Sequence, residues 1–434
     1  MKLVVIGTGY VGLVSGLCFA EFGFETICID KDKDKLDKLK KGKSSFFEPG
    51  LEELLLKHIN STKRFSLSNN LSESLKDANV VFITVGTPSK RLENEADLSA
   101  VYEIAKEISK NINNYCVIVT KSTVPVGTTR KIKEILSQNV SNDKFDVVSN
   151  PEFLREGSAI NDFMRPDRVV IGTENKKSEN IIREIYRPLY LQETPIISTT
   201  IESAEIIKYA SNSFLATKIA FINEVADLCE ATGANVQDVA EAMGMDKRIG
   251  SKYLHSGPGF GGSCFPKDVK AFSATARKMG IELAIVDAVN SSNQERPIKV
   301  ASKIAKYYKN NLTSITLTIL GLSFKPNTDD IRNSTSLKIA RELLTKGAKI
   351  QVYDPKAMNN VENKMNELKC CENSYEACKK SSGLIIATEW NEFRALDLDR
   401  VKELMIDPVI FDLRNIYNKE EVEDLGIIYH GIGK

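Results

Sequence analysis

The chain has 434 residues, of which 42% are hydrophobic and 27% charged, and its formal net charge is +1. A chain of this length exceeds one ordinary hydrophobic core, so we expect two or three domains. Because 59 Lys and Arg residues nearly balance 58 Asp and Glu residues, the composition argues against nucleic acid or an anionic membrane surface as a partner. No stretch approaches the ~20 apolar residues of a membrane span.

The eight cysteines are scattered along the chain. Cys370, Cys371 and Cys378 cluster, but they lack the paired spacing of a zinc site, so we predict no metal. The N-terminal apolar run is too short for a signal peptide. Without an export signal, we expect reduced thiols and a cytoplasmic protein, with seven of the cysteines serving as small buried residues.

The first part of the chain alternates short apolar runs with helical segments. Buried strands are predicted at 2–7, 25–30, 79–88, 115–125 and 145–153, and a helix is predicted near 10–22. Continuous apolar strands separated by helices indicate a parallel sheet covered on both faces. Several runs end in Gly, Thr, Ser or Pro, and ligands gather where the strands of such sheets end. The lysine-rich segment 31–43 is expected to be a solvated helix face.

The pattern changes in the middle of the chain, where residues 199–230 predict one long helix followed by Gly233. A third part begins near residue 312 and repeats the strand, glycine turn, helix and strand plan of the first part. Asp30 and Asp354 end the second strand of each repeat, and further strands are expected at 383–390 and 408–415. We therefore predict an α/β protein with two Rossmann-like, doubly wound domains, over 1–198 and 301–434, joined by a helical middle domain over 199–300.

The segment GTGYVG places Gly7, Gly9 and Gly12 after a predicted strand and at the start of a predicted helix. Asp30 follows Gly12 at the distance that a dinucleotide-binding fingerprint requires. The glycines allow a tight turn, a close approach of the pyrophosphate to the backbone, and close helix packing. The helix N-terminus then faces the phosphates. Asp30 would bind an adenosine ribose and disfavour a 2′-phosphate, so the motif predicts NAD rather than NADP.

Polar residues lie at three other predicted strand ends or turns. Thr87 follows one strand, and Thr123 follows the next, where Pro125 also fits a capped helix start. Glu152 and Glu156 would share a face if their segment were helical, and one could activate water; otherwise they would form a solvated pair.

Lys208 and Asn212 are four residues apart on the long predicted helix and therefore share a face. Such a pair of donors could stabilise an oxyanion if the helix lined a cleft. Alone, a Lys and Asn pair at this spacing is usually a surface feature, and both interpretations stay open at this point.

The segment GPGFGGSCFPKD, residues 257–268, is a poor helix or strand interior and is expected to be a shaped loop. Glycines at 259, 261 and 262 would let backbone N–H groups approach a ligand. Cys264 is either a small filler or a nucleophile, and Lys267 would favour its thiolate. An NAD site combined with a nucleophilic cysteine would allow a four-electron oxidation of CH₂OH to a carboxylate through an aldehyde and a thioester.

These motifs together resemble the UDP-glucose/GDP-mannose dehydrogenase family, and within it the branch that oxidises UDP-glucose. The matching segments span about residues 1–340 in the expected order: GTGYVG, FFEPGL, VGTP, STVPVGT, NPEFLREGSAI, EIIKYASNSFLATKIAFINE, DKRIGSKYLHSGPGFGGSCFPKD and GLSFKPNTDDIRNS. The resemblance implies that the C-terminal domain binds the UDP-sugar and that the middle domain supports a homodimer.

The resemblance also implies roles for individual residues. Cys264 would be the nucleophile, Lys208 and Asn212 would stabilise oxyanions, and Lys208 could accept a proton in the first oxidation. Thr123, Glu152 and Asp268 would position or activate the hydrolytic water. The implied NAD contacts are Gly7, Gly9, Tyr10, Val11, Gly12, Asp30, Lys35, Thr87, Thr123, Glu156, Lys267 and Arg332. The implied UDP-sugar contacts are Glu152, Phe153, Leu154, Arg155, Glu156, Lys208, Asn212, Tyr253, Leu254, His255, Ser256, Gly257, Phe260, Gly261 and Lys325, with Arg248 reaching the substrate of a neighbouring subunit.

Three alternatives to the oxidation of UDP-glucose with NAD remain. The same chemistry could act on GDP-mannose or a UDP-N-acetylhexosamine, because specificity between hexoses rests on few contacts. A two-electron hydroxyacid dehydrogenase of similar plan would need no cysteine. A catalytically silent sensor of NAD or nucleotide sugar would need none of Cys264, Lys208, Asn212 and Asp268.

Overall fold

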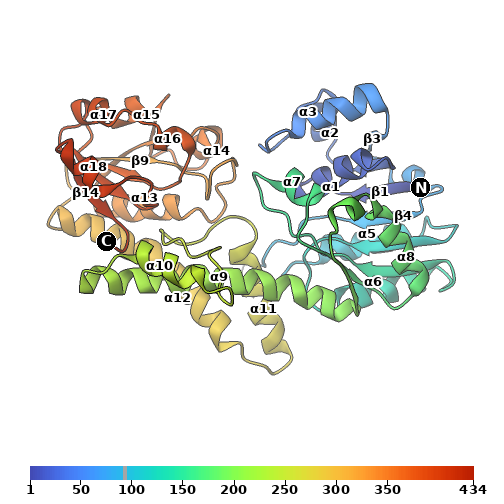
Figure 1. Ribbon diagram of the computed structural model, residues 1–434. Coiled ribbons are helices and arrows are strands. Elements are labelled where there is room, and N and C mark those ends of the chain that lie inside the picture. The colour runs from blue at the N-terminus through green and yellow to red at the C-terminus, as the bar shows by residue number, and fades with distance from the viewer. Residues whose placement is uncertain (91–94) are drawn as a thin grey trace. The chain divides into compact units, whose positions relative to one another are not determined.

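The computed structural model describes residues 1–90 and 95–434 (Figure 1). The chain forms two compact units. The first unit contains Met1–Ser211 and Ala274–Ile281, and the second contains Asn212–Ser273 and Glu282–Lys434. Each unit is built around its own sheet, so each is described by itself.

The described residues of the first unit form an eight-stranded sheet in the order β3-β2-β1-β4-β5-β6-β7-β8. The strands are β1 (Lys2–Ile6), β2 (Glu25–Ile29), β3 (Phe65–Ser68), β4 (Val80–Ile83), β5 (Cys116–Thr120), β6 (Phe145–Ser149), β7 (Val169–Gly172) and β8 (Ile196–Thr199). Neighbours from β3 through β6 are parallel, which confirms the predicted sheet. β7 runs antiparallel to β6 and parallel to β8, and this strand pair was not predicted.

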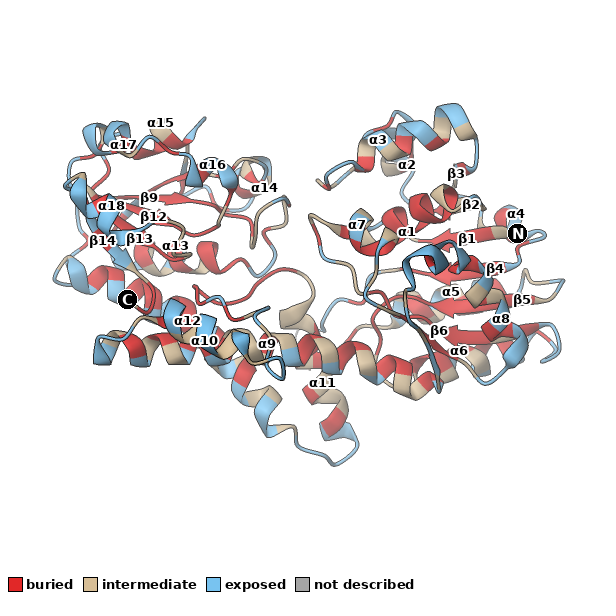
Figure 2. Ribbon diagram, in the orientation of Figure 1, coloured by how far each residue is buried: buried red, intermediate tan, exposed pale blue. Residues whose placement is uncertain are grey.

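Helices cover both faces of this sheet, and the sequence of β1 shows why. Leu3 and Val5 belong to one buried apolar cluster, whereas Val4 and Ile6 belong to another, because successive side chains of a strand point to opposite faces. The strands β1, β4, β5, β6 and β7 are accordingly buried along most of their length, whereas the edge strands β3 and β8 are partly exposed (Figure 2). The helical segments are α1 (Tyr10–Glu21), α2 (Lys33–Lys40), α3 (Leu51–Lys57), η1 (His58–Thr62), α4 (Leu71–Leu75), α5 (Ser99–Ser109), α6 (Thr128–Ser137), α7 (Ala159–Met164), α8 (Lys176–Ile185) and η2 (Arg187–Gln192).

The predicted long helix is confirmed as α9, Ile201–Thr232. The hydroxyl of Thr200 accepts the backbone N–H of Ser203 at 3.2 Å, which caps the start of the helix. Gly233, with a φ of 77°, takes the left-handed conformation that ends it.

The described residues of the second unit form a six-stranded, wholly parallel sheet in the order β11-β10-β9-β12-β13-β14. This order matches that of the first six strands of the other sheet, so the predicted repeat of the Rossmann-like plan is confirmed. The strands are β9 (Thr316–Leu320), β10 (Lys349–Tyr353), β11 (Lys369–Cys370), β12 (Gly383–Ile386), β13 (Val409–Asp412) and β14 (Ile428–Gly431). The remaining helices are α10 (Val236–Met245), α11 (Phe265–Lys278), α12 (Ala284–Tyr307), α13 (Thr335–Thr345), α14 (Met358–Glu362), α15 (Ser374–Cys378), α16 (Asn391–Arg394), α17 (Leu398–Leu404) and α18 (Lys419–Asp424).

Among residues 1–90 and 95–434, no helix combines the length and apolar character that a membrane crossing requires. In the same described residues, no group of three or more His, Cys, Asp or Glu side chains is arranged to hold a metal ion. The eight cysteines all lie in the described part, and none of them is in a disulfide there.

Candidate active site

The glycine motif between β1 and α1 forms a cradle for a dinucleotide. Gly9 stands at the N-cap of α1, and no described side chain caps this end of the helix. Its first N–H groups are therefore available to an anion. A Cβ at Gly9 would meet no described atom within 4 Å, whereas one at Gly12 would lie 1.9 Å from the carbonyl oxygen of Gly7. The open side at Gly9 and the bare helix start fit the pyrophosphate of NAD.

Asp30 follows β2 and lies beside this cradle. One carboxylate oxygen accepts the backbone N–H and the hydroxyl of Thr8, and Lys35 pairs with the same oxygen at 3.0 Å. Burial alone would raise the pKa of Asp30, but the hydrogen bonds from Thr8, Asp32 and Lys35 together lower it to about 2. Asp30 is therefore ionised at neutral pH, as a hydrogen-bond acceptor for ribose hydroxyls should be.

Thr87 and Thr123 are joined at the carboxyl ends of β4 and β5. The hydroxyl of Thr87 donates to the backbone oxygen of Thr123 at 2.8 Å, and both residues are buried. The alternative that Thr123 and Pro125 start a helix is wrong, because α6 begins only at Thr128. Its first N–H groups are bound instead by a carboxylate from α9: Glu205 accepts from Gly127 at 2.7 Å and from Thr129 at 2.8 Å.

Glu152 and Lys208 form a buried ion pair, with 3.1 Å between Oε1 and Nζ. Lys208 is only 3% exposed, so the alternative of a surface lysine is wrong. Residues 151–157 form a loop rather than a helix, so Glu152 and Glu156 do not share a helix face, although both are buried.

The other side chains of this loop point to several partners. Phe153 stacks against the guanidinium of Arg168, 3.5 Å from the ring centroid, and lies 5.3 Å from Nζ of Lys208. Arg155 binds both carboxylate oxygens of Asp162 on α7, at 2.9 and 2.6 Å. The backbone N–H of Leu154 donates to Glu152. The loop is thus tied to α7 on one side and to the Glu152–Lys208 pair on the other.

Glu48, in the segment FFEPGL, was assigned no role from the sequence. Its buried carboxylate accepts the hydroxyl of Tyr10 and the backbone N–H groups of Gly157 and Ala159, at 2.6 and 2.7 Å. The N–H of Gly157 also donates to the Tyr10 hydroxyl at 2.8 Å. Tyr10 therefore fastens the start of α1 to the loop that carries Glu152. The one sign of this role in the sequence was that Glu48 is an acidic residue within the short apolar segment FFEPGL.

A second buried lysine, Lys121, also went unassigned. It follows β5, and its Nζ donates to Oδ1 of Asn150 at 3.2 Å and to the hydroxyl of Tyr186 at 3.1 Å. The signal in the sequence was a lysine inside the strand-end segment TKSTVP. Tertiary contacts from β6 and α8, which no spacing rule predicts, make it a buried group.

In the second unit, Cys264 directly precedes α11. Its carbonyl oxygen accepts the N–H of Asp268 at 2.8 Å, so Cys264 opens the helix. The Asp268 carboxylate is buried; it accepts Nδ2 of Asn212 at 2.6 Å and pairs with Lys267 at 2.5 Å. Asn212 is 6% exposed, so it is no more a surface residue than Lys208. The structure therefore brings Cys264, Lys267, Asp268 and Asn212 into one group.

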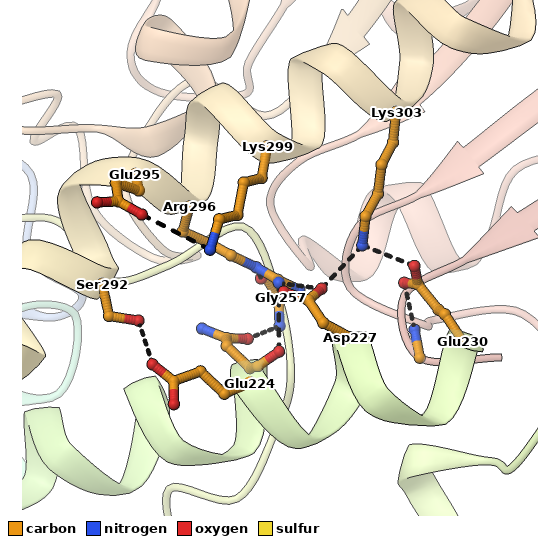
Figure 3. Close-up of polar contacts among 11 residues, drawn as sticks. Glu224, Asp227, Glu230, Gly257, Ser292, Glu295, Arg296, Lys299 and Lys303 are labelled. Atoms are coloured by element: carbon orange, nitrogen blue, oxygen red, sulfur yellow. Dashed lines mark hydrogen bonds and ion pairs between the residues drawn. The ribbon is translucent and has the colours of Figure 1, made fainter. Parts of the chain in front are cut away.

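The loop that leads to Cys264 is held by side chains of α9 and α12. The N–H of Gly257 donates to Oδ1 of Asn223 at 2.8 Å, and its carbonyl accepts Nε of Arg296 at 3.1 Å. Arg296 also pairs with Asp227 at 2.5 Å, and these contacts lie between the two helices in Figure 3. Asn293 binds both the N–H and the carbonyl of Phe260. These residues were missed because only the fold brings them to the loop.

The glycines of this loop allow close packing within the protein. A Cβ at Gly262, where φ is 83°, would lie 2.8 Å from the ring of Phe324, and one at Gly261 would lie 2.6 Å from the carbonyl oxygen of Asn333. At these two positions protein atoms occupy the space that a side chain would need, so the packing itself requires glycine. The approach of a ligand to the backbone N–H groups of this loop stays a prediction.

The remaining predicted contacts of the second unit lie on its loops. Arg332 pairs with Asp330 at 2.8 Å, and Lys325 lies 5.5 Å from the ring centroid of Phe324. Arg248 is largely exposed and pairs with Asp246 at 2.6 Å. Tyr253 has a φ of 66°. Beside it, Leu254 and Ser256 are buried, whereas His255 is exposed.

Comparison with known proteins identifies the class. Three family models match in order: the NAD binding domain of the UDP-glucose/GDP-mannose dehydrogenase family over residues 1–190, its central domain over 202–295, and its UDP binding domain over 318–419. The chain belongs to the UDP-glucose/GDP-mannose dehydrogenase family. The predicted NAD cofactor and dehydrogenase class are confirmed.

Individual relatives match over the whole chain. The UDP-glucose 6-dehydrogenase of Rhizobium meliloti (strain 1021) is 48% identical, with 100% of both sequences covered. That of Bacillus subtilis (strain 168) is 43% identical, covering 100% of this chain and 93% of the relative. Among solved structures, a UDP-glucose dehydrogenase from Pyrobaculum islandicum has a TM-score of 0.91 at 37% identity, covering 100% of this chain and 97% of that one.

Proposed function

We propose that this protein is a UDP-glucose 6-dehydrogenase, which oxidises UDP-glucose to UDP-glucuronate with reduction of two NAD molecules. The observation that carries the proposal is the group formed by Cys264, Asp268 and Asn212 in a chain that also carries the glycine cradle. The relatives of the same name, which match at full length, support the choice of UDP-glucose. A thiol at the start of a helix is suited to covalent catalysis, because the N–H groups of the first turn favour its thiolate.

Residues of the first unit would make most of the contacts to NAD. The start of α1 would bind the pyrophosphate, with Gly7, Gly9, Tyr10, Val11 and Gly12 forming the turn, and Asp30 and Lys35 would bind the adenosine ribose. Thr87, Thr123, Glu156, Lys267 and Arg332 would make the other contacts. NAD, when bound, accepts the hydride in each of two oxidations.

The first oxidation needs a base for the proton of the primary hydroxyl. Lys208 would take this proton while the hydride leaves the same carbon, which gives the aldehyde. The ion pair with Glu152 holds Nζ of Lys208 at 3.1 Å from the carboxylate in a buried site. Asn212 would donate to the carbonyl oxygen as negative charge develops on it.

The second oxidation needs the thiol. The Cys264 thiolate would attack the aldehyde carbon and form a C–S bond, and Lys208 and Asn212 would stabilise the oxyanion. Hydride loss from this carbon gives a thioester. A water positioned by Thr123, Glu152 and Asp268 would then add to the thioester carbon, the C–S bond would break, and Cys264 would regain its thiol form.

The UDP-sugar would be bound by the residues that the resemblance implies. These are residues 152–156, Lys208, Asn212, residues 253–257, Phe260, Gly261 and Lys325. The match to a UDP binding domain over 318–419 supports the nucleotide part of this assignment. We assign the functional domains to 1–198 for NAD, 199–300 for the connector and dimerisation, and 301–434 for the UDP-sugar.

We also propose a cytoplasmic homodimer in which Arg248 reaches the substrate of the other subunit. An apolar stripe on α9 supports the dimer. Phe214, Phe221 and Leu228 are spaced by seven residues and are 66%, 51% and 64% exposed. A helix with such a stripe is self-complementary to a second copy of itself.

The test is the yield of NADH per UDP-glucose consumed, measured for the wild type, Cys264→Ser and Cys370→Ser. The control is matched because Cys264 and Cys370 are both cysteines of intermediate burial that form no disulfide in the described structure. We expect two NADH per sugar for the wild type and Cys370→Ser, and turnover reduced at least a hundredfold, roughly, for Cys264→Ser.

Other outcomes would redirect the assignment. One NADH per sugar, or full turnover of Cys264→Ser, would indicate a two-electron dehydrogenase. NADH formed only with GDP-mannose or a UDP-N-acetylhexosamine would keep the mechanism and change the substrate. Binding of NAD and UDP-glucose without NADH would indicate a sensor.

A further inference from the structure

Lys121 is a buried cation at the carboxyl end of β5. The residue is 3% exposed, and its Nζ lies 5.6 Å and 5.8 Å from the ring centroids of Phe163 and Tyr186. Both of its hydrogen-bond acceptors, Oδ1 of Asn150 and the hydroxyl of Tyr186, are neutral oxygens. A buried ammonium held by neutral acceptors is costly for the fold, so its retention calls for a functional reason.

The acceptors of Lys121 are themselves fixed. The Tyr186 hydroxyl donates to Oδ1 of Asn150 at 2.7 Å, and Nδ2 of Asn150 donates to the carbonyl of Val170 at 2.8 Å. The backbone N–H of Asn150 donates to Thr120, immediately before Lys121, at 3.0 Å. Lys121 is therefore locked to the residue that lies two positions before Glu152.

Four ionisable groups surround Lys121 from separate elements: Glu152 in the loop after β6, Lys208 on α9, Cys18 on α1 and Tyr186 after α8. Burial is the main cause that lowers the pKa of Lys121 to about 8; the charge of Lys208 acts in the same direction, whereas Glu152 and Cys18 oppose the shift. Coupling between two charges is reciprocal. The charge of Lys121 therefore disfavours a proton on Lys208.

We propose that Lys121 is a positioning residue for the reaction, whose buried ammonium, fixed by Asn150 and Tyr186, keeps Lys208 ready to accept the substrate proton. This inference rests on the proposed function, because it concerns the base of the first oxidation. Two buried lysines close to each other cannot both be charged without cost. A charged Lys121 therefore makes the neutral form of Lys208, which can accept a proton, easier to reach.

The test is the pH dependence of kcat/KM for NADH formation from UDP-glucose in Lys121→Gln. Glutamine keeps an N–H donor for Asn150 and Tyr186 but removes the charge. We expect the acidic limb of the profile to move upward by about one pH unit, which is about a tenfold loss near neutral pH that recovers at alkaline pH. Lys121→Arg, which keeps the charge, should leave the limb where the wild type has it.

The thermal midpoint and the affinity for NAD are measured in parallel, as readouts that do not depend on turnover. A folded Lys121→Gln protein that loses the same factor at every pH, or nothing, would overturn the proposal. If this variant does not fold, Tyr186→Phe replaces it: it removes one acceptor of the ammonium, and it should move the limb upward by less. An unmoved limb there would equally overturn the proposal.

The proposed function can fail separately. A wild-type protein that forms no NADH from UDP-glucose refutes the enzyme assignment itself. A wild type that does form NADH, with coincident profiles for wild type and variant, refutes only the role of Lys121.

Discussion

At the scale of single residues, Gly9 and Gly12 of GTGYVG are needed for different physical reasons. A side chain at Gly12 would collide with the carbonyl of Gly7, whereas one at Gly9 would point into open space at the start of α1. Gly12 is therefore required by the fold, and Gly9 is required only by what binds there. A substitution at Gly12 should therefore lower mainly the stability of the fold, and one at Gly9 mainly the affinity for NAD.

We expect Gly12→Ala to destabilise the first unit by about 3 kcal/mol, because backbone atoms rather than a flexible side chain block the new methyl group. Gly9→Ala should cost only about 1 kcal/mol as a poorer N-cap residue, yet weaken NAD binding about tenfold or more, since the methyl group would stand where the pyrophosphate approaches. Urea unfolding and calorimetric titration with NAD measure the two effects. Gly9→Ala with unchanged NAD affinity would contradict the placement of the pyrophosphate.

The sequence singled out candidate residues but not their surroundings. Cys264, Asp268, Lys208 and Asn212 come from motifs, and the structure buries the last three and pairs them with polar partners; their roles in catalysis stay predictions. The same local patterns could not show burial, because burial arises from segments far apart in the chain. Lys121 was missed for that reason.

At the scale of elements, local signals placed the helices but not all of their caps. Gly233 ends α9 as predicted, and Thr200 caps its start. The start of α6 differs, since its two backbone donors are bound by Glu205 from α9, and no local rule anticipates a cap from another helix. The β7 and β8 strands were likewise missed, because their short apolar runs resemble many loop segments.

The cap on α6 has a testable pH dependence. Burial raises the pKa of Glu205 from 4.5 to about 7, so the folded protein binds this proton more tightly than the unfolded chain does. The resulting stability is fully present below the unfolded pKa and is lost as the pH rises through 7. Glu205→Gln has no such proton, so the wild type should lose about 2–3 kcal/mol relative to the variant between about pH 5 and about pH 8.

Urea unfolding at the two pH values measures this difference, and Glu202→Gln is the control. Glu202 lies one helical turn earlier on α9 and pairs with Arg130, which lowers its pKa. The contribution of Glu202 to stability depends on pH in the opposite direction: it is present above the unfolded pKa and is lost as the pH falls. A Glu205→Gln difference that follows the Glu202→Gln direction would show that Glu205 is ionised throughout.

At the scale of the whole molecule, the repeat was the strongest prediction. Both sheets place their first six strands in the same order, and both end their second strand with an aspartate that binds the preceding turn. The carboxylates of Asp354 and Asp30 differ in how far they are buried and in the partners they bind. Asp354 is buried, and one of its oxygens accepts Leu322, Ser323 and Trp390. Asp30 keeps a partly exposed side chain in the unit that matches an NAD binding domain.

The assembly is the last property of the whole molecule that the sequence implies. The stripe of Phe214, Phe221 and Leu228 lies on α9, and each side chain is more than half exposed. Burial of these apolar side chains against a second copy would stabilise a dimer, and a charge in the centre of the stripe would be buried without a partner. We expect Phe221→Glu to weaken dimerisation by about 2–4 kcal/mol, which is roughly a 30- to 1,000-fold increase in Kd.

Sedimentation equilibrium over a range of protein concentrations measures this change. Ile406→Glu is the matched control, because Ile406 is 64% exposed and lies outside α9, so it should leave the dimer unchanged. Since Arg248 is proposed to act on the substrate of the other subunit, the Phe221→Glu monomer should also lose turnover while it keeps its affinity for NAD. A wild-type chain that sediments as a monomer, or a fully active Phe221→Glu monomer, would show that each subunit completes its own site.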